Sequence, residues 1–167
     1  EIVLKYKEVF GEFIQSIGQQ AGIKNFPAHV ELRLDSKGRI NPIEINPLRF
    51  GGLCTTADLL GIATGFSPYD FYLKNLKPDW EKVFYGKESK LISIVVLNNN
   101  SGYTPDEIES FDYDLLSLDF ENALTIRKFD VINYSAFGFV FAETSPENEA
   151  ELNNILVSDL RKYITLK

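Results

Sequence analysis

The feature that most restricts the fold is a strict alternation of apolar and polar residues over positions 28–35. Its apolar members are Val30, Leu32 and Leu34. An alternation with a period of two is typical of a β-strand with one apolar and one polar face. Turn-forming residues at 36–39 lead into a second such strand at about 40–46, in which we expect Ile43 and Ile45 to face inward. The sequence therefore predicts an antiparallel hairpin.

The register of this hairpin brings two acidic residues together. If Asp35 and Ile40 close a four-residue turn, Glu31 lies directly opposite Glu44 on the polar face. The same register gives the other pairs of this face, which are His29 with Asn46 and Arg33 with Pro42. Like charges directly opposite each other are destabilising. Either one carboxyl group therefore takes up a proton, its pKa raised by its neighbour, or a cation lies between the two.

The residues of this face suit a divalent cation. Mg²⁺ binds oxygen ligands, typically one or two carboxylates together with phosphate and water. Glu31, Glu44 and the side-chain oxygen of Asn46 supply such a set. The alternative is a pair of solvated glutamates that Arg33 screens. We interpret His29 as a structural residue, or as one that supports the site, rather than as a catalyst.

The segments His29–Arg33 and Pro42–Gly52 resemble the C-terminal nucleotide and metal site of the ATP-grasp superfamily. That superfamily includes D-alanine–D-alanine ligase, biotin carboxylase and many carboxylate–amine ligases. Its pattern is an acidic residue on one strand, Glu-x-Asn on the next strand, and then a loop rich in proline or glycine, often with an arginine. The resemblance extends over roughly residues 1–75, and it rests chiefly on the Glu-x-Asn-Pro string with an acidic residue upstream.

The resemblance implies an ATP-dependent activity with a defined ligand set. Glu31, Glu44 and Asn46 would bind Mg²⁺ or Mn²⁺, with Glu44 bridging two ions, and the ions would bind the β- and γ-phosphates of ATP. The γ-phosphoryl group would pass to a small carboxylate substrate, and an amine or similar nucleophile would attack the resulting acyl phosphate. The family therefore implies a carboxylate–amine ligase whose cofactors are ATP and a divalent cation.

The loop after the second strand contains the other implied site residues. Arg49 would be the catalytic residue that binds the acyl phosphate or the substrate carboxylate, since a guanidinium binds such oxygens in bidentate fashion. In many family members this arginine directly follows Asn-Pro, whereas here Leu48 intervenes. Gly51 and Gly52 would let the backbone approach the nucleotide. They precede a helix that starts near Thr55 and would turn its free N–H groups toward the loop.

The remaining patterns predict a mixture of helices and strands. Helices are expected at 6–21, 55–64, about 67–76 and from Ser145 onward, and further strands at 91–97, 124–131 and 136–143. The first of these strands is a continuous apolar run, which is typical of burial on both faces. In the last strand Phe137, Phe139 and Phe141 alternate, so we expect all three to point to one side, into the core.

We therefore expect an α+β fold, in which an antiparallel sheet with packed helices, like an ATP-grasp C-terminal subdomain, is followed by a small α/β extension. Residues 1–80 would be the C-terminal portion of an ATP-grasp domain, and residues 81–167 an acidic extension of unassigned role. The family's upstream subdomain, with its phosphate-binding lysines and glycine-rich flap, is not recognisable before Glu31. We expect the chain to be a fragment of a ligase, with little activity by itself.

Charge and composition exclude several classes of partner and of protein. The net charge is −7, and residues 98–167 carry 13 acidic and 5 basic residues, which argues against nucleic-acid binding. No apolar run approaches the roughly 20 residues that cross a bilayer. A single cysteine excludes a disulfide scaffold and fits a cytoplasmic location, and a single histidine excludes most histidine-based metal sites. A homodimer stays open, as do two alternatives: a non-catalytic ATP-grasp-like binding or regulatory module, and an unrelated α+β interaction domain.

Overall fold

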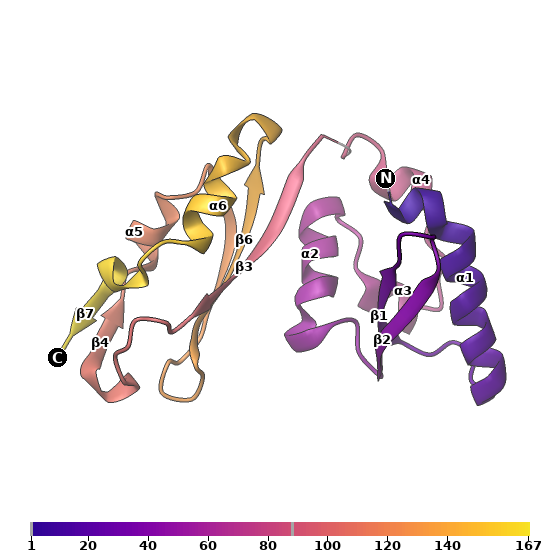
Figure 1. Ribbon diagram of the computed structural model, residues 1–167, viewed down its shortest axis with the longest axis horizontal. Coiled ribbons are helices and arrows are strands. Elements are labelled where there is room, and N and C mark those ends of the chain that lie inside the picture. Colours follow the sequence, from indigo (N-terminus) through magenta and orange to yellow (C-terminus); the bar gives the residue numbers. More distant parts are fainter. Residues whose placement is uncertain (1, 88) are drawn as a thin grey trace. The chain divides into compact units, whose positions relative to one another are not determined.

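The computed structural model describes residues 2–87 and 89–167, which form two compact units. The first unit contains the chain up to Ala57 together with Pro68–Lys77, and the second contains Asp58–Ser67 together with Pro78–Lys167. Each unit combines helices with antiparallel strands (Figure 1). The predicted α+β fold class is therefore confirmed.

The first unit is built from one long helix, a hairpin and shorter helical segments. Its elements are α1 (Ile2–Ala21), β1 (Ala28–Leu34), β2 (Ile40–Pro47), the 3₁₀ helix η1 (Gly52–Cys54), the start of α2 (Thr55–Thr64) and α3 (Pro68–Leu73). The predicted amphipathic helix is thus confirmed as α1. This helix, predicted at 6–21, ends because Gly22 adopts a φ of 67°, and the Ile23 N–H donates to the Gly18 carbonyl oxygen at 2.9 Å.

The half of the hairpin that carries the glutamates has the predicted register. Glu31 lies opposite Glu44, and His29 lies opposite Asn46. All four side chains therefore belong to one face of the two-stranded sheet, since alternate residues of a strand point to the same side. The backbone arrangement on which the predicted site depends is thus present.

The half of the hairpin next to the turn is shifted by one residue. Ile43 is an extra residue on β2 and forms a β-bulge. Arg33 consequently lies opposite Asn41, and its predicted pairing with Pro42 is wrong. The bulge brings the strands back into the predicted register at Glu31.

Asp35 determines where the turn closes. Its backbone N–H donates to the Arg39 carbonyl oxygen at 3.1 Å, and its carboxylate accepts from the N–H groups of Lys37 and Arg39 at 2.8 and 2.9 Å. The turn therefore closes at Arg39 rather than at the predicted Ile40. Local hydrogen bonds from a short acidic side chain compete successfully with the longer turn.

The apolar side of the hairpin is only partly covered. Ile43 and Ile45, predicted to face inward, are 57% and 45% exposed. Val30 and Ile45 instead line an apolar groove of about 740 Å³ together with residues of α1, which runs alongside the hairpin in Figure 1. The prediction of inward burial is wrong because a two-stranded sheet beside one helix has too little neighbouring surface to cover it.

The second unit contains a three-stranded antiparallel sheet in the order β3–β6–β5 and a two-stranded sheet of β4 and β7. The strands are β3 (Leu91–Asn98), β4 (Ile108–Phe111), β5 (Asn122–Lys128), β6 (Ala136–Thr144) and β7 (Ile164–Leu166), and the helices are α4 (Trp80–Phe84), η2 (Pro105–Glu107), α5 (Tyr113–Ser117), η3 (Pro146–Asn148), α6 (Ala150–Leu156) and η4 (Leu160–Tyr163). Figure 1 shows α5 and α6 on the same side of the three-stranded sheet. Leu116 of α5 and Ile155 of α6 pack with Val140 of β6 in the hydrophobic core.

The strand that is buried on both faces is β6 rather than β3. Val140 and Phe141, which point to opposite faces of β6, are 0% and 1% exposed. In β3 only Leu97 is fully buried, and Val96 is half exposed. The predicted burial of residues 91–97 on both faces is therefore wrong, because β3 lies at the edge of the sheet and β6 at its centre.

A second β-bulge changes the direction of one phenylalanine. β6 has one extra residue, Phe137, relative to β3. Phe137 therefore packs in the core with Val140, whereas Phe139 and Phe141 alternate with Val140 and point to the opposite face. The prediction that all three face one side is wrong, but all three are buried, as expected for core residues.

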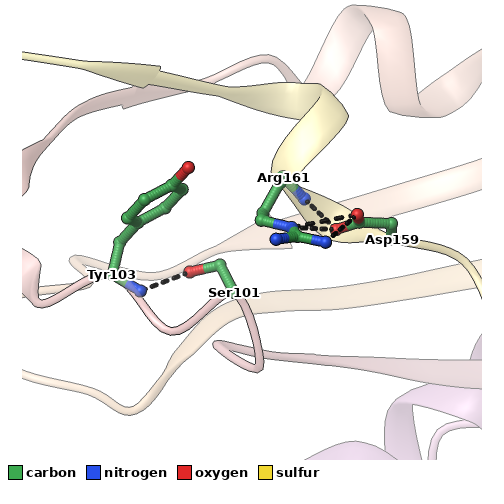
Figure 2. Close-up of polar contacts among 4 residues, drawn as sticks. All are labelled: Ser101, Tyr103, Asp159 and Arg161. Atoms are coloured by element: carbon green, nitrogen blue, oxygen red, sulfur yellow. Dashed lines mark hydrogen bonds and ion pairs between the residues drawn. The ribbon is translucent and has the colours of Figure 1, made fainter.

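An ion pair between Asp159 and Arg161 starts η4 (Figure 2). The Asp159 carboxylate accepts from the Arg161 backbone N–H at 3.0 Å and from its guanidinium at 2.6–2.9 Å. Figure 2 also shows Tyr103 in a neighbouring loop, where its N–H donates to Ser101 Oγ at 3.1 Å. The hydrogen bonds with the side chain and backbone of Arg161 lower the pKa of Asp159 from 3.8 to about 2.

Replacing Arg161 by glutamine is expected to return the pKa of Asp159 from about 2 toward 3.8. A carboxyl group whose pKa is lowered in the folded state stabilises that state above its unfolded-state pKa. The stabilisation is lost as the pH falls from about 3.8 to about 2. A carboxyl-carbon NMR titration measures the pKa of Asp159 in the parent chain and in the variant. Asp79, whose pKa is lowered by Lys82, serves as the internal control. An unchanged Asp159 pKa would contradict the assignment.

Candidate metal site

The polar face of the hairpin holds the carboxylates of Glu31 and Glu44. The two residues are directly paired across β1 and β2, which places their Cβ atoms about 5 Å apart. Both side chains are about half exposed. Glu31 Oε1 lies 3.8 Å from His29 Nδ1, and Glu44 Oε1 lies 4.0 Å from Arg49 Nη2. Both distances exceed that of a hydrogen bond, so neither the imidazole nor the guanidinium makes a close contact that would offset the charge of the two carboxylates.

His29 and Asn46 form the next pair on the same face. His29 Nδ1 and Asn46 Nδ2 are buried, and neither has a hydrogen-bond partner within the described part of the chain. Buried polar groups in folded proteins are almost always hydrogen-bonded, so such atoms call for an explanation. Their position beside the paired glutamates makes a bound ligand or a supporting interaction the natural explanation.

Arg49 is brought to the glutamates by the loop that follows β2. Leu48 adopts a φ of 60°, and its N–H donates to the Pro27 carbonyl oxygen at 2.8 Å. This left-handed residue, held by the residue that precedes β1, fixes the direction in which Arg49 leaves β2. The guanidinium of Arg49 then lies 4.0 Å from Glu44 Oε1.

The end of this loop is strained and held by aromatic side chains. Leu53 and Cys54 both adopt positive φ angles, of 48° and 63°, which non-glycine residues rarely do. Such strain persists where the surroundings enforce it, often at functional sites. The ring of Phe50 lies 5.1 Å from that of Tyr69 and 6.0 Å from that of Tyr72, and both tyrosines belong to α3.

Tyr69 also binds the loop through its hydroxyl group. A hydrogen bond with the Cys54 thiol raises the pKa of Tyr69 above its ordinary value. The sequence interpretation missed this support of the loop by α3. The signal available was the spacing of Tyr69 and Tyr72, which are three residues apart and therefore share one side of a helix.

The two glycines of the loop differ in what the backbone requires. Gly51 has a φ of 102°, and a Cβ atom there would overlap the Thr56 hydroxyl group. A Cβ atom at Gly52 would meet no atom within 4 Å. The N–H of Ala57 in the first turn of α2 donates to the Phe50 carbonyl oxygen at 3.2 Å. The expectation of free N–H groups at the start of α2 is therefore wrong for Ala57, because the loop folds back onto the helix.

The donor set of this face fits a hard divalent cation. Glu31 and Glu44 supply carboxylate oxygens from adjacent strands, and Asn46 adds an amide beside them. Mg²⁺ and Mn²⁺ take such oxygen ligands and complete their coordination with phosphate and water. Among the described residues no group of three or more His, Cys, Asp and Glu side chains could hold a metal ion. A cation at this face would therefore be held by the two glutamates and the amide, with the oxygens of water or of a second ligand completing its coordination.

Comparison with known proteins finds one match. Residues 1–57 match the model of a family described as an ATP-grasp domain. No curated protein and no solved structure gives a significant match to the chain. The matched residues include the hairpin with Glu31, Glu44 and Asn46. Within the described residues, none of the helices has the length and apolar character needed to span a membrane.

Proposed function

We propose that the polar face of the hairpin binds the divalent cation and the ATP phosphates of a ligase. The premise is the match of residues 1–57 to the model of an ATP-grasp domain. The metal ligands in this proposal are Glu31, Glu44 and Asn46. Gly51 and Gly52 would lie against the nucleotide. The substrate is a small carboxylate, which is activated as an acyl phosphate and then attacked by an amine or similar nucleophile.

The direct pairing of Glu31 with Glu44 is the observation that carries this proposal. Two carboxylates in this position repel each other and destabilise the hairpin. The imidazole of His29 and the guanidinium of Arg49 approach them only to 3.8 and 4.0 Å. A shared divalent cation removes the repulsion, which supports a metal-binding role over a solvated pair of glutamates.

Each residue of the face has a distinct task in the proposed reaction. Mg²⁺ or Mn²⁺, when bound, would neutralise charge on the phosphate oxygens during phosphoryl transfer. Glu31 and Glu44 provide negative charge from two rigid strands, and Asn46 provides a neutral oxygen. Arg49 binds the substrate carboxylate or the acyl phosphate, because its guanidinium forms paired hydrogen bonds with such groups. The weak contact with Glu44 leaves the guanidinium free to exchange partners.

Titration of the full chain with Mn²⁺ tests the proposal. Replacing Glu44 by glutamine keeps the size of the side chain and removes one of the two charges. We expect the Mn²⁺ dissociation constant to rise by about tenfold or more, measured by electron paramagnetic resonance of free Mn²⁺. Glu12, an exposed glutamate on α1, provides the matched control: Glu12→Gln should leave the binding curve unchanged. No binding by the parent chain, or an unchanged curve for Glu44→Gln, would contradict the proposal.

A further inference from the structure

His29 and Asn46 each have a buried side-chain nitrogen without a hydrogen-bond partner, which points to one cause. Buried side-chain atoms without a hydrogen-bond partner occur, in the part of the chain that the structure describes, at His29 Nδ1, Asn46 Nδ2, Ser93 Oγ and Ser158 Oγ. Two of these atoms belong to residues that lie directly opposite each other on β1 and β2. Both residues are next to the pair of Glu31 and Glu44. The other two atoms are in the second unit and have no such counterpart.

The two atoms are chemically complementary. The amide nitrogen of Asn46 can only donate, whereas Nδ1 of a neutral imidazole accepts when the proton is on Nε2. Directly opposed residues in an antiparallel pair have Cβ atoms about 5 Å apart, within reach of one hydrogen bond between their side chains. An Asn46 amide turned the other way would instead set its oxygen against the imidazole lone pair.

We infer that His29 is a positioning residue for Asn46, and that its Nδ1 accepts a hydrogen bond from Asn46 Nδ2. This bond fixes the amide so that Oδ1 stays available as a metal ligand, which rests on the function proposed above. In this tautomer Nδ1 carries no proton and donates no hydrogen bond to Glu31, whose Oε1 lies 3.8 Å away. His29 therefore leaves both the Glu31 carboxylate and the Asn46 oxygen free for a cation. Partners that orient metal ligands in this way contribute strongly to metal affinity.

The tautomer of His29 tests the hydrogen bond without any metal. The chain contains a single histidine, so a long-range ¹H–¹⁵N spectrum of the imidazole needs no assignment. We expect the metal-free parent chain, at a pH where the ring is neutral, to hold its proton on Nε2. Replacing Asn46 by leucine should then redistribute the proton between the two nitrogens. A proton on Nδ1 in the parent, or a spectrum that Asn46→Leu leaves unchanged, would overturn the inference.

Mn²⁺ titration of His29 variants of the full chain tests the effect on metal binding. His29→Leu removes the acceptor and should raise the dissociation constant by about tenfold or more, whereas His29→Gln keeps an acceptor oxygen and should recover most of the affinity. Amide NMR spectra check that each variant folds.

The decisive comparison uses an Asn46→Asp background. A carboxylate has two equivalent oxygens and needs no orientation, so His29→Leu should leave the Mn²⁺ dissociation constant unchanged in that background. Equal losses in both backgrounds, or no loss in the parent, would overturn the inference. A parent chain that binds no Mn²⁺ contradicts the proposed function instead, and the tautomer then decides the His29–Asn46 bond by itself.

Discussion

Replacing Gly138 by alanine is expected to destabilise the second unit by about 4 kcal/mol. Gly138 follows the bulge residue of β6 and has a φ of 146°, a conformation that other residues rarely adopt. A Cβ atom there would overlap the Arg127 carbonyl oxygen, and it would lie 3.0 Å from the carbonyl carbon of Arg127 and 3.3 Å from Lys128 Cα. These are backbone atoms of β5, so they cannot move aside without breaking the pairing of β5 with β6.

Gly102 provides the matched control for this substitution. It lies in the same unit and has a positive φ of 86°, but a Cβ atom there would meet no atom within 4 Å. Gly102→Ala should therefore cost only the backbone strain, about 1 kcal/mol. Urea unfolding followed at the amide signals of β6 measures both variants on the same element. Equal costs for the two variants would show that the close approach of β5 does not constrain residue 138.

The register around the glutamates could be predicted because β1 alternates strictly and β2 alternates over residues 43–46, and a slip of one residue would turn every side chain to the other face. The turn could not be predicted in the same way. Hydrogen bonds to the Asp35 carboxylate close it at Arg39, and Ile43 compensates as an extra residue in β2. Two local departures therefore cancel before the site is reached.

The errors in the second unit come from long-range pairing. Residues 91–97 and 136–143 are both apolar runs, and which of them lies at the centre of the sheet depends on the strand order β3–β6–β5. The bulge at Phe137 has a similar origin, because it exists only relative to the neighbouring strand. A glycine within an apolar strand, here Gly138, is the feature of the sequence that indicates such a bulge.

In the candidate site too, local patterns could be predicted and long-range contacts could not. Glu31, Glu44 and Asn46 could be named because motif and register act over a short stretch of chain. The positive φ angles of the following loop, and the contact of Cys54 with Tyr69, depend on how α3 folds back onto the loop. Local patterns therefore predict which residues form the site, whereas the backbone that supports them is determined by packing.

Replacing Glu151 by alanine is expected to destabilise the second unit by about 3 kcal/mol. Glu151 is a charged residue of α6 that is only 8% exposed, and its carboxylate connects three elements. It accepts from Thr144 Oγ1 at the end of β6 at 2.8 Å, from the Glu121 N–H just before β5, and from Asn148 Nδ2 at 3.3 Å. Thr144 is fully buried, so alanine at position 151 leaves its hydroxyl group without a partner and without access to water.

Two further variants separate the hydrogen bonds of Glu151 from its charge. Glu151→Gln keeps one acceptor oxygen but sets an amide N–H₂ against donors, so an intermediate cost of about 1.5 kcal/mol is expected. Glu149→Ala removes an exposed glutamate at the start of the same helix, where it makes no side-chain cap, and should change stability by less than about 0.5 kcal/mol. Native-state hydrogen exchange at Val140 and Phe141 measures all three variants at the centre of the sheet. If Glu151→Ala and Glu151→Gln lower the stability equally, the buried hydrogen bonds do not hold α6 against the sheet. If Glu149→Ala lowers the stability as much as Glu151→Ala, the effect belongs to the charge of the helix.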